Sequence, residues 1–473
     1  MATLHELAAL LPGARLVGGG DVAITRVHSD TRSLQPGDLF VALAGERFDA
    51  HDFIADARTK GCAAVLGERG IAEAGLPGLL VADSRRALGA LAAAWRRRFS
   101  IPLIAVTGSN GKTTVTQMIA SILSAWVGEG ARLATQGNFN NDIGLPLTLL
   151  RLRPQHRAAV VEIGMNHRGE VAELAPMAAP TVALVNNAQR EHQEFMSSVE
   201  AVARENGEVL RALMPGGTAV FPAGDAYSAL WQSLAQPHRC ATFGFGIHAY
   251  VNADVLNKNN GQLIDTQGEY GHIQLDIALP GQHNAHNALA AATCALVAGA
   301  PAAAVAQGLA AFRPVKGRSH SEQLRVGAHT LTLIDDTYNA NPDSVRAAID
   351  VLAACAAPRW LVLGDMGEVG AQGPQFHREV GAYARERGVS WLFALGDQAM
   401  HAAQAFDATP HADGRPHAAH FATRDALAHE LRRALGIELP ASVLIKGSRF
   451  MRMEEFVQVV RDTATTLRGH DAA

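Results

Sequence analysis

The most restrictive feature of this chain is a glycine-rich turn between an apolar segment and a helical one. The segment 101–107 (IPLIAVT) is short, apolar and rich in β-branched residues, as a buried parallel strand should be. The sequence GSNGKTT follows at 108–114, and a helix is predicted from about 113 to 126. In this context backbone N–H groups can surround a phosphate group. The pattern therefore predicts a P-loop at one edge of a parallel sheet.

Each residue type in the turn suits that chemistry. Glycines let the backbone approach phosphate oxygens, and the helix N-terminus adds positive potential. Lys112 can bind the outer phosphates, and the hydroxyl of Thr113 can be a Mg²⁺ ligand. Val106 stands where the common GxxxxGK[ST] pattern has its first glycine. The alternative is a turn without a ligand, but a lysine placed here has no evident packing purpose. The predicted ATP-binding residues of the turn are Gly108, Ser109, Asn110, Gly111, Lys112, Thr113 and Thr114.

Three α/β units are predicted from the length of 473 residues and from alternating strand-like and helical segments. Residues 1–98 form a small N-terminal unit with short strands at 38–43, 63–66 and 79–82. Residues 99–314 form a central P-loop unit with a parallel sheet and helices on both faces, and 240–280 is rich in strand signals. Residues 315–473 form a C-terminal Rossmann-like unit, with strands at 330–335, 359–364, 391–395 and 442–446.

Composition excludes several classes of protein. Apolar residues make up 48%, which is typical of a folded domain, and the net charge of −4 argues against a nucleic-acid partner. The four cysteines are far apart, so neither a zinc site nor a redox dithiol is expected, and the thiols are expected to be reduced. No signal peptide or membrane-spanning run is found. We therefore expect a cytoplasmic enzyme without membrane insertion.

The sequence TGSNGKTT resembles the shortened P-loop of the Mur ligases, the ATP-dependent amide-forming enzymes of peptidoglycan assembly. Folylpolyglutamate synthetase is similar in the same region. The resemblance extends from about residue 25 to about residue 455. It implies a three-domain ligase that uses ATP and Mg²⁺, with Lys112, Glu162 and His192 as catalytic residues.

The N-terminal stretch 29–53 (SDTRSLQPGDLFVALAGERFDAHDF) resembles the uridine-nucleotide binding part of the family. The residues alone favour a turn or helix cap at Asp30-Thr31. The resemblance implies a binding pocket formed by Ser29, Asp30, Thr31, Arg32, Phe48, Asp49 and His51.

Three further segments of the central unit match the family. TQGNFNNDIGLPLTLL (135–150) resembles the loop near the reacting ends of the substrates, which implies substrate contacts from Asn138, Asn140 and Asn141, although asparagine is equally common in turns. The resemblance makes Thr113, Glu162 and His192 the metal ligands. Glu162 and His192 each follow an apolar strand, where a carboxylate can also serve as a helix cap.

One position departs from the family pattern. The family usually has a lysine 14 residues after this histidine, and that lysine is carbamylated to bind a second metal ion. This chain has Asn206, which cannot form a carbamate. Our hypothesis is that Asn206 hydrogen-bonds a metal-bound water or the phosphate region directly, with Glu205 or Glu208 as weaker candidates.

Residues after position 280 complete the ATP site by the same resemblance. Asn287, in GQHNAHNALAA (281–291), is expected to contact adenine, Arg318 the phosphates and Asp336 the ribose, with Asp335 equally possible from the residues alone. The stretch DDTYNANPDS (335–344) resembles the family members that add D-alanyl-D-alanine. It implies that Tyr338, Asn339 and Asn341 contact the dipeptide or ATP.

The resemblance implies one substrate pair and leaves two alternatives. The substrates would be a UDP-muramoyl tripeptide and D-Ala-D-Ala, joined through an acyl phosphate by an enzyme expected to be monomeric. A ligase that adds the third residue usually carries a DNPR string, which is absent here. Another enzyme of this fold, including folylpolyglutamate synthetase, is one alternative. A P-loop NTPase switch is the more remote one.

Overall fold

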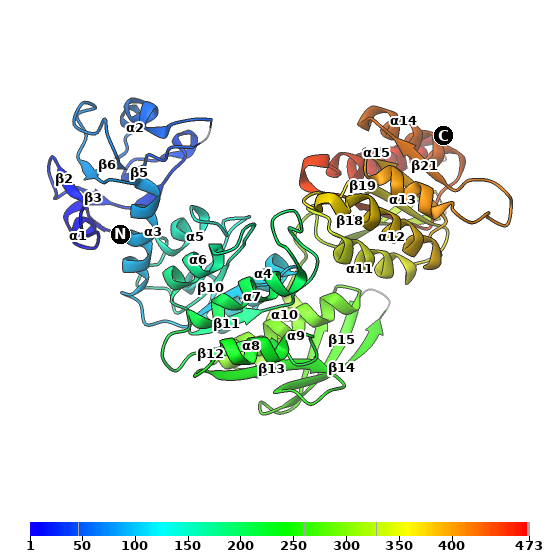
Figure 1. Cartoon of the computed structure of the whole chain (residues 1–473), viewed down its shortest axis with the longest axis horizontal. Coiled ribbons are helices and arrows are strands. Elements are labelled where there is room, and N and C mark those ends of the chain that lie inside the picture. Colours follow the sequence, from blue (N-terminus) through cyan, green and yellow to red (C-terminus); the bar gives the residue numbers. More distant parts are fainter. Residues whose placement is uncertain (46, 259–260, 328, 471–473) are drawn as a thin grey trace.

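Three large β-sheets and the two-stranded sheet β1-β3, with surrounding helices, make up the described part of the chain (Figure 1), and they confirm the predicted three-domain α/β fold. The computed structural model describes residues 1–45, 47–258, 261–327 and 329–470. The N-terminal and C-terminal domains stand apart from each other, each next to a different part of the central domain (Figure 1).

The N-terminal domain has a five-stranded sheet in the order β2-β7-β6-β5-β4. Strands β4 to β7 are parallel neighbours, and β2 runs antiparallel to β7. The predicted strands at 38–43, 63–66 and 79–82 correspond to β5, β6 and β7. The elements are β1 (Ala2–Thr3), α1 (Leu4–Ala9), β2 (Arg15–Val17), β3 (Ala23–Ile24), β4 (Arg26–His28), β5 (Asp38–Val41), α2 (Ile54–Thr59), β6 (Ala64–Gly67), β7 (Gly78–Leu80) and α3 (Ser84–Arg96).

The central domain has a nine-stranded sheet in the order β16-β15-β14-β13-β12-β11-β8-β10-β9. Its elements are β8 (Leu103–Thr107), α4 (Lys112–Val127), β9 (Arg132–Ala134), α5 (Gly144–Leu149), β10 (Ala158–Glu162), α6 (Glu170–Ala178), β11 (Val182–Val185), α7 (Val199–Arg211), β12 (Thr218–Pro222), α8 (Ser228–Leu234), β13 (Arg239–Phe245), β14 (Val251–Lys258), β15 (Gly261–Gly268), β16 (Ile273–Ile277), α9 (Gln282–Val297) and α10 (Ala302–Ala311).

Side-chain alternation along β8 explains the two layers of helices. Leu103 and Ala105 belong to a core that includes residues of α6 and α7, whereas Ile104 and Val106 belong to a core that includes residues of α4, α9 and α10. Successive side chains of a strand point to opposite faces, so a continuous apolar run fills both cores. This arrangement places the carboxyl ends of β8, β10 and β11 next to one another.

The edge of the central sheet has a feature that the prediction did not include. The seven strands from β9 to β14 in the sheet order, β8 among them, are joined in parallel, but β15 pairs antiparallel with both β14 and β16. The predicted parallel sheet is therefore confirmed, and the strand-rich segment 240–280 adds an antiparallel extension to it. The connections from β14 to β15 and from β15 to β16 are short enough for antiparallel hairpins.

The C-terminal domain has a six-stranded sheet in the order β17-β18-β22-β19-β20-β21, parallel except for β17. The four predicted strands correspond to β18, β19, β20 and β22. Its elements are β17 (His320–Val326), β18 (His329–Asp336), α11 (Pro342–Ala353), β19 (Arg359–Gly364), α12 (Gly373–Glu386), β20 (Trp391–Leu395), α13 (Ala399–Phe406), β21 (Ala418–Phe421), α14 (Arg424–Ile437), β22 (Ser442–Lys446) and α15 (Glu454–His470).

Helix α3 joins the N-terminal domain to the central one. Leu88, Leu91 and Trp95 share one apolar core with the N-terminal sheet and with α5 and α6, and Trp95 Nε1 donates to the carbonyl of Leu152 (3.1 Å). Arg96 is buried, and its guanidinium donates to two carbonyls at the end of α6 and to two in the segment between α3 and β8: those of Ala178, Ala179, Phe99 and Ile101. Burial lowers the pKa of Arg96 to about 10.

Among the residues that the structure describes, none of the helices is both long enough and apolar enough to cross a membrane.

Replacing Arg96 tests this connection. Arg96→Ala should cost about 2–4 kcal/mol of stability, because several buried carbonyl groups lose a charged donor. Thermal unfolding followed by circular dichroism would show a lower Tm. Arg96→Lys keeps the charge without the planar guanidinium group, and its Tm should lie between those of Arg96→Ala and the wild type. A Tm for Arg96→Ala equal to that of the wild type would contradict this role.

Candidate active site

A cavity of about 1210 Å³ lies between the central and C-terminal domains, at the carboxyl ends of β8, β10 and β18. Ligands of open parallel sheets bind at this end of the strands. Of the residues predicted from sequence, those that line the cavity are Ser109, Asn110, Gly111, Lys112, Thr113, Thr114, Asn140, Asn141, Glu162, His192, Asn287, Arg318, Asp336, Tyr338, Asn339 and Asn341.

The glycine-rich loop has the backbone shape that the sequence predicts. Gly108 and Gly111 have φ angles of 130° and 83°, in the region that favours glycine. A Cβ atom on Gly111 would lie 2.3 Å from Asn287 Oδ1 and 2.8 Å from Asn186 Nδ2. Gly111 is also the N-cap of α4, so the loop leads directly into the start of that helix. The loop therefore presents a helix N-terminus to the cavity.

Side-chain amides next to the loop bind its polar groups. Asn186 Nδ2 and Asn187 Nδ2 both donate to the Asn110 carbonyl (2.9 Å each), and the Asn110 N–H donates to Asn187 Oδ1 (2.9 Å). Asn186 also donates to Asn287 Oδ1 (2.9 Å). Asn287, predicted to contact adenine, thus packs directly against the phosphate loop, and its adenine role stays a prediction.

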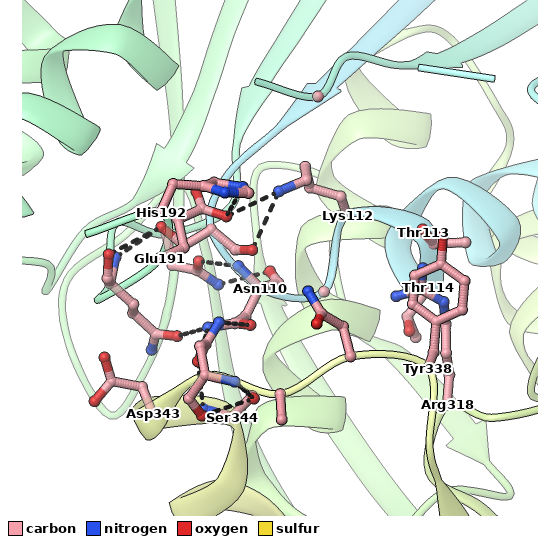
Figure 2. Close-up of a pocket in the computed structure, with 18 of the residues that line it drawn as sticks. Asn110, Lys112, Thr113, Thr114, Glu191, His192, Arg318, Tyr338, Asp343 and Ser344 are labelled. Carbon is pink, nitrogen blue, oxygen red and sulfur yellow. Dashed lines mark hydrogen bonds and ion pairs between the residues drawn. The ribbon is translucent and has the colours of Figure 1, made fainter. Parts of the chain in front are cut away.

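Lys112 folds back onto its own loop (Figure 2). Its Nζ donates to the carbonyls of Gly108 (2.6 Å) and Ser109 (3.1 Å) and lies 3.2 Å from Glu191 Oε2. Glu191 is 6% exposed, and its other oxygen, Oε1, is buried without a hydrogen-bond partner. The Lys112 ammonium group is therefore neutralised by a carboxylate that the sequence analysis did not select.

Glu162 presents a carboxylate to the cavity from the end of β10. It is 2% exposed, Oε1 accepts from Asn140 Nδ2 (2.7 Å), and Oε2 is buried without a partner. An unpaired buried carboxylate oxygen next to a hydroxyl-bearing P-loop suits a Mg²⁺ ion that takes other ligands from phosphates and water. Within the described ranges, no group of three or more His, Cys, Asp or Glu side chains could hold a metal ion.

His192, predicted to be a metal ligand, connects two domains. Its Nδ1 lies 2.6 Å from Glu368 Oε2 of the C-terminal domain, and its Nε2 lies 3.7 Å from Glu191 Oε2. The close contact with His192 lowers the pKa of Glu368 below its usual range, although burial opposes this. The metal-ligand role of His192 stays a prediction.

Asn206 does not line the cavity, but its side chain hydrogen-bonds the phosphate loop, which agrees with the part of the hypothesis that placed it on the phosphate region. A contact with a metal-bound water stays a prediction. Asn206 is 1% exposed, and its Oδ1 accepts from the Gly108 N–H (2.9 Å) beneath the loop. Glu205, the weaker candidate, accepts from the N–H groups of Gly169 and Val171 at the start of α6. Helix α7 turns both side chains away from the cavity.

Three of the predicted C-terminal residues line the cavity: Arg318 just before β17, Asp336 at the end of β18 and Tyr338 just after it. Arg318 stacks on the ring of Tyr338, 3.8 Å from its centroid. Asp336 accepts from Lys446 Nζ (2.5 Å) and from the Ser319 N–H (2.9 Å). Burial opposes ionisation of Asp336, but the Lys446 charge and these hydrogen bonds hold its pKa below the usual value.

Polar contacts hold the C-terminal domain against the central one. Asn341 caps α11 by accepting from the Ser344 N–H (2.9 Å), and its Nδ2 donates to Asn110 Oδ1 (2.9 Å). Arg190 pairs with Asp343 (2.5 Å) and Glu379 (2.8 Å). These carboxylates, Asp343 first, raise the pKa of Arg190. The C-terminal domain therefore contacts both the P-loop and the loop after β11.

The predicted residues of the N-terminal domain do not line this cavity. Ser29 to Thr31 follow β4 and Phe48-Asp49 follow β5, so both segments lie at the carboxyl edge of neighbouring parallel strands. Phe48 is 73% exposed, and Asp30 caps a short 3₁₀ turn by accepting from the Arg32 N–H. His51 is buried; its Nδ1 is hydrogen-bonded to Asp49 Oδ1 (2.6 Å), and its Nε2 accepts from the Glu68 N–H (2.9 Å). Their nucleotide role stays a prediction.

Two other predicted residues do not line the cavity. Asn138 is exposed, whereas Gly108 is buried. Asn141 Oδ1 accepts from the Gly144 N–H (2.8 Å) at the start of α5, so the expected turn role is present. The structure leaves a substrate role for these asparagines as a prediction.

Three family descriptions match successive parts of the chain. They are the Mur ligase family catalytic domain at residues 23–96, the Mur ligase middle domain at 106–295 and the Mur ligase glutamate ligase domain at 322–449. The chain is 39% identical over 468 residues to UDP-N-acetylmuramoyl-tripeptide–D-alanyl-D-alanine ligase of Escherichia coli strain K12, covering 98% of this chain and 99% of that protein. The chain belongs to the Mur ligase family.

Other relatives of this Mur ligase agree in length and fold. The Haemophilus influenzae enzyme of the same name is 36% identical and covers 97% of this chain and 98% of its own. Crystal structure I of MurF from Acinetobacter baumannii is 32% identical with a TM-score of 0.87, covering 98% of this chain and 99% of that one. The similarity therefore includes all three domains of the Mur ligase.

Sequence reasoning missed several residues of this Mur ligase site. Glu191, Arg190 and Glu368 were not selected, although all are charged and two directly precede His192. A pair of charged residues after an apolar strand was the available signal for Arg190 and Glu191. Glu368 contacts His192 from a distant part of the chain, and no local pattern predicts that contact.

Gly111→Ala tests the loop geometry. The added Cβ would overlap Asn287 at a φ that strains any other residue, and each effect costs about 1–3 kcal/mol. We therefore expect ADP binding, measured by isothermal titration calorimetry, to weaken at least about tenfold. Gly130→Ala is the matched control, because a Cβ at Gly130 meets no atom within 4 Å. Equal ADP affinity for the two variants would contradict the predicted phosphate site.

Proposed function

We propose that this Mur ligase adds D-Ala-D-Ala to a UDP-N-acetylmuramoyl tripeptide and forms the pentapeptide precursor of peptidoglycan with consumption of ATP. The observation that carries the proposal is full-length similarity to ligases of that name, together with a P-loop that opens into an interdomain cavity. The alternatives from the sequence, a ligase for the third residue or a P-loop switch, gain no specific support from the site.

The proposed reaction activates a carboxylate and then couples it to an amine. An oxygen of the tripeptide carboxylate attacks the γ-phosphorus of ATP, which releases ADP and leaves an acyl phosphate. The amine of D-Ala-D-Ala attacks the acyl carbon, phosphate leaves with the C–O bonding electrons, and the amine loses a proton. Catalysis of this kind depends mainly on positioning and on charge neutralisation.

The residues on the cavity wall supply those two effects. The N–H groups of the loop and Lys112 bind the β- and γ-phosphates, and Arg318 adds a positive charge from the C-terminal domain. Asp336, held in place by its ion pair with Lys446, accepts a hydrogen bond from a hydroxyl group of the ribose. Asn341 donates a hydrogen bond to Asn110, so the segment that follows β18 lies against the phosphate loop. We assign the contacts with the dipeptide to the residues of this segment, Tyr338, Asn339 and Asn341.

A divalent cation fits this wall, and we propose Mg²⁺ with Thr113 and Glu162 as its protein ligands and His192 as a further one. Once bound, Mg²⁺ would neutralise charge on the phosphate oxygens during transfer. Glu162 is kept in position by Asn140, so its unpaired oxygen stays directed at the cavity without rearrangement of the loop.

The proposal also includes a uridine-nucleotide site in the N-terminal domain and the predicted domain boundaries. The N-terminal segments around Asp30 and Asp49 would bind the uridine nucleotide at the carboxyl edge of their sheet. The predicted boundaries, 98/99 and 314/315, fall between α3 and β8 and between α10 and β17. A monomeric state and a cytoplasmic location remain predictions.

Phosphate release tests the proposed reaction. With ATP, Mg²⁺ and UDP-muramoyl tripeptide, release should require D-Ala-D-Ala, and mass spectrometry should show the UDP-muramoyl pentapeptide. Omitting D-Ala-D-Ala is the control. Steady release without either acceptor would point to an NTPase, and extension of a UDP-muramoyl dipeptide by one amino acid would point to the preceding ligase.

Bicarbonate provides a separate test, because an asparagine cannot form a carbamate. Activity in degassed buffer should equal activity with added bicarbonate, and Asn206→Ala should weaken ATP binding, since the Gly108 N–H then loses its acceptor. The cost of about 1 kcal/mol for one such hydrogen bond corresponds to about fivefold in affinity. Strong stimulation by bicarbonate would show that a carbamate forms elsewhere in the site.

A further inference from the structure

Glu191 is a buried carboxylate at the phosphate end of the cavity, and the reaction described above does not use it. Figure 2 shows it next to His192, within reach of Lys112. Its Oε2 lies 3.2 Å from Lys112 Nζ, and its Oε1 is buried with no hydrogen-bond partner. Only 6% of the residue is exposed. A group in this position interacts with any polyanion that enters the loop.

Lys112 has no spare donor in this structure. An ammonium group has three N–H donors, and here Nζ contacts Gly108 O, Ser109 O and Glu191 Oε2. Binding to the outer phosphates of a nucleotide requires Lys112 to release at least one of these partners. The phosphates and Glu191 are both anionic, so they compete for the same cation.

Release of Lys112 would leave the Glu191 carboxylate without compensation. A buried charge that loses its partner is strongly unfavourable, and a nearby triphosphate adds repulsion. The neighbouring Arg190 already pairs with Asp343 and Glu379. His192 Nε2 is 3.7 Å from Glu191 Oε2, and its other nitrogen contacts Glu368. The compensating positive charge must therefore arrive with the nucleotide.

We propose that Glu191 makes nucleotide binding in this ligase depend on a divalent cation. In the nucleotide-free protein it holds Lys112 away from the phosphate position. When Lys112 turns to the phosphates, the unpaired Glu191 carboxylate faces the cation that accompanies them. Mg²⁺ prefers carboxylate and phosphate oxygens, which are the ligands that this end of the cavity supplies. The inference rests on the proposed function and deepens its ATP site.

Calorimetry with the full-length protein tests the inference through binding alone. ADP is titrated into the protein in excess Mg²⁺ and, separately, in EDTA, and the ratio of the two affinities is compared among variants. Glu191→Gln removes the charge with little change of shape. Glu194→Gln is the matched control, because Glu194 lies on the same loop and is exposed. Glu191→Asp keeps the charge.

For Glu191→Gln we expect tighter ADP binding in EDTA and a ratio at least about tenfold smaller than that of the wild type, within the usual range for two coupled ligands. Glu191→Asp should keep most of the ratio, and Glu194→Gln should keep all of it. A gain in metal-free affinity cannot result from misfolding, so thermal unfolding of each variant only confirms that the chains are intact.

Two results would overturn the inference while leaving the proposed function in place. The ratio for Glu191→Gln equals that of the wild type if Lys112 bridges Glu191 and the phosphates in the complex. Affinity falls equally with and without Mg²⁺ if Glu191 only supports the loop. Failure of the wild type to bind ADP even in Mg²⁺ would overturn both the inference and the proposed ATP-dependent ligase.

Discussion

The hydrogen bonds between the phosphate loop and the side-chain amides around it determine the geometry of the whole site. A loop that binds phosphate must keep several N–H groups unpaired toward the ligand, and its carbonyls must be satisfied elsewhere. Asn186 and Asn187 bind the carbonyl of Asn110, while Asn206 accepts from Gly108. Because these residues follow β11 or lie on α7, the sheet order that places β11 next to β8 is what brings them to the loop. The catalytic loop is thus shaped by other parts of the chain.

The same loop after β11 also receives the C-terminal domain. Arg190 and His192 contact Asp343, Glu379 and Glu368, and Asn341 contacts the phosphate loop itself. All of these contacts are polar, and each can be exchanged for water at moderate cost. The active site must close to keep water from the acyl phosphate and must then open to release a large product. An interface made of exchangeable polar contacts allows both steps.

The sequence predicted those parts of the protein that depend on local pattern. The P-loop, the strands beside it and Glu162 follow from short apolar runs and their flanking residues, and the three units follow from the chain length and the alternation of strand-like and helical segments. The antiparallel hairpin of β15 was missed, because period and composition do not distinguish parallel from antiparallel pairing in a strand-rich segment. Glu191 and Glu368 were missed because their importance comes from Lys112 and His192, which meet them only in the folded chain. Asn206 was placed in the right region, but the rotation of α7 turns its side chain beneath the loop.

The apolar core that passes from the N-terminal sheet through α3 to α5 and α6 determines which parts of the molecule can move. Separating these two domains would expose Leu88, Leu91 and Trp95 to water and break the bonds of Arg96. The three described apolar clusters of the C-terminal domain contain only residues from 324 onward, so a rotation of that domain would not open its apolar interior. If the segments around Asp30 and Asp49 bind the uridine nucleotide as proposed, one continuous apolar core holds them at a set distance from the phosphate loop. The substrate would then have to match that distance between its uridine and its reacting carboxylate, whereas, among the residues that the structure describes, no such core ties the C-terminal domain to the phosphate loop.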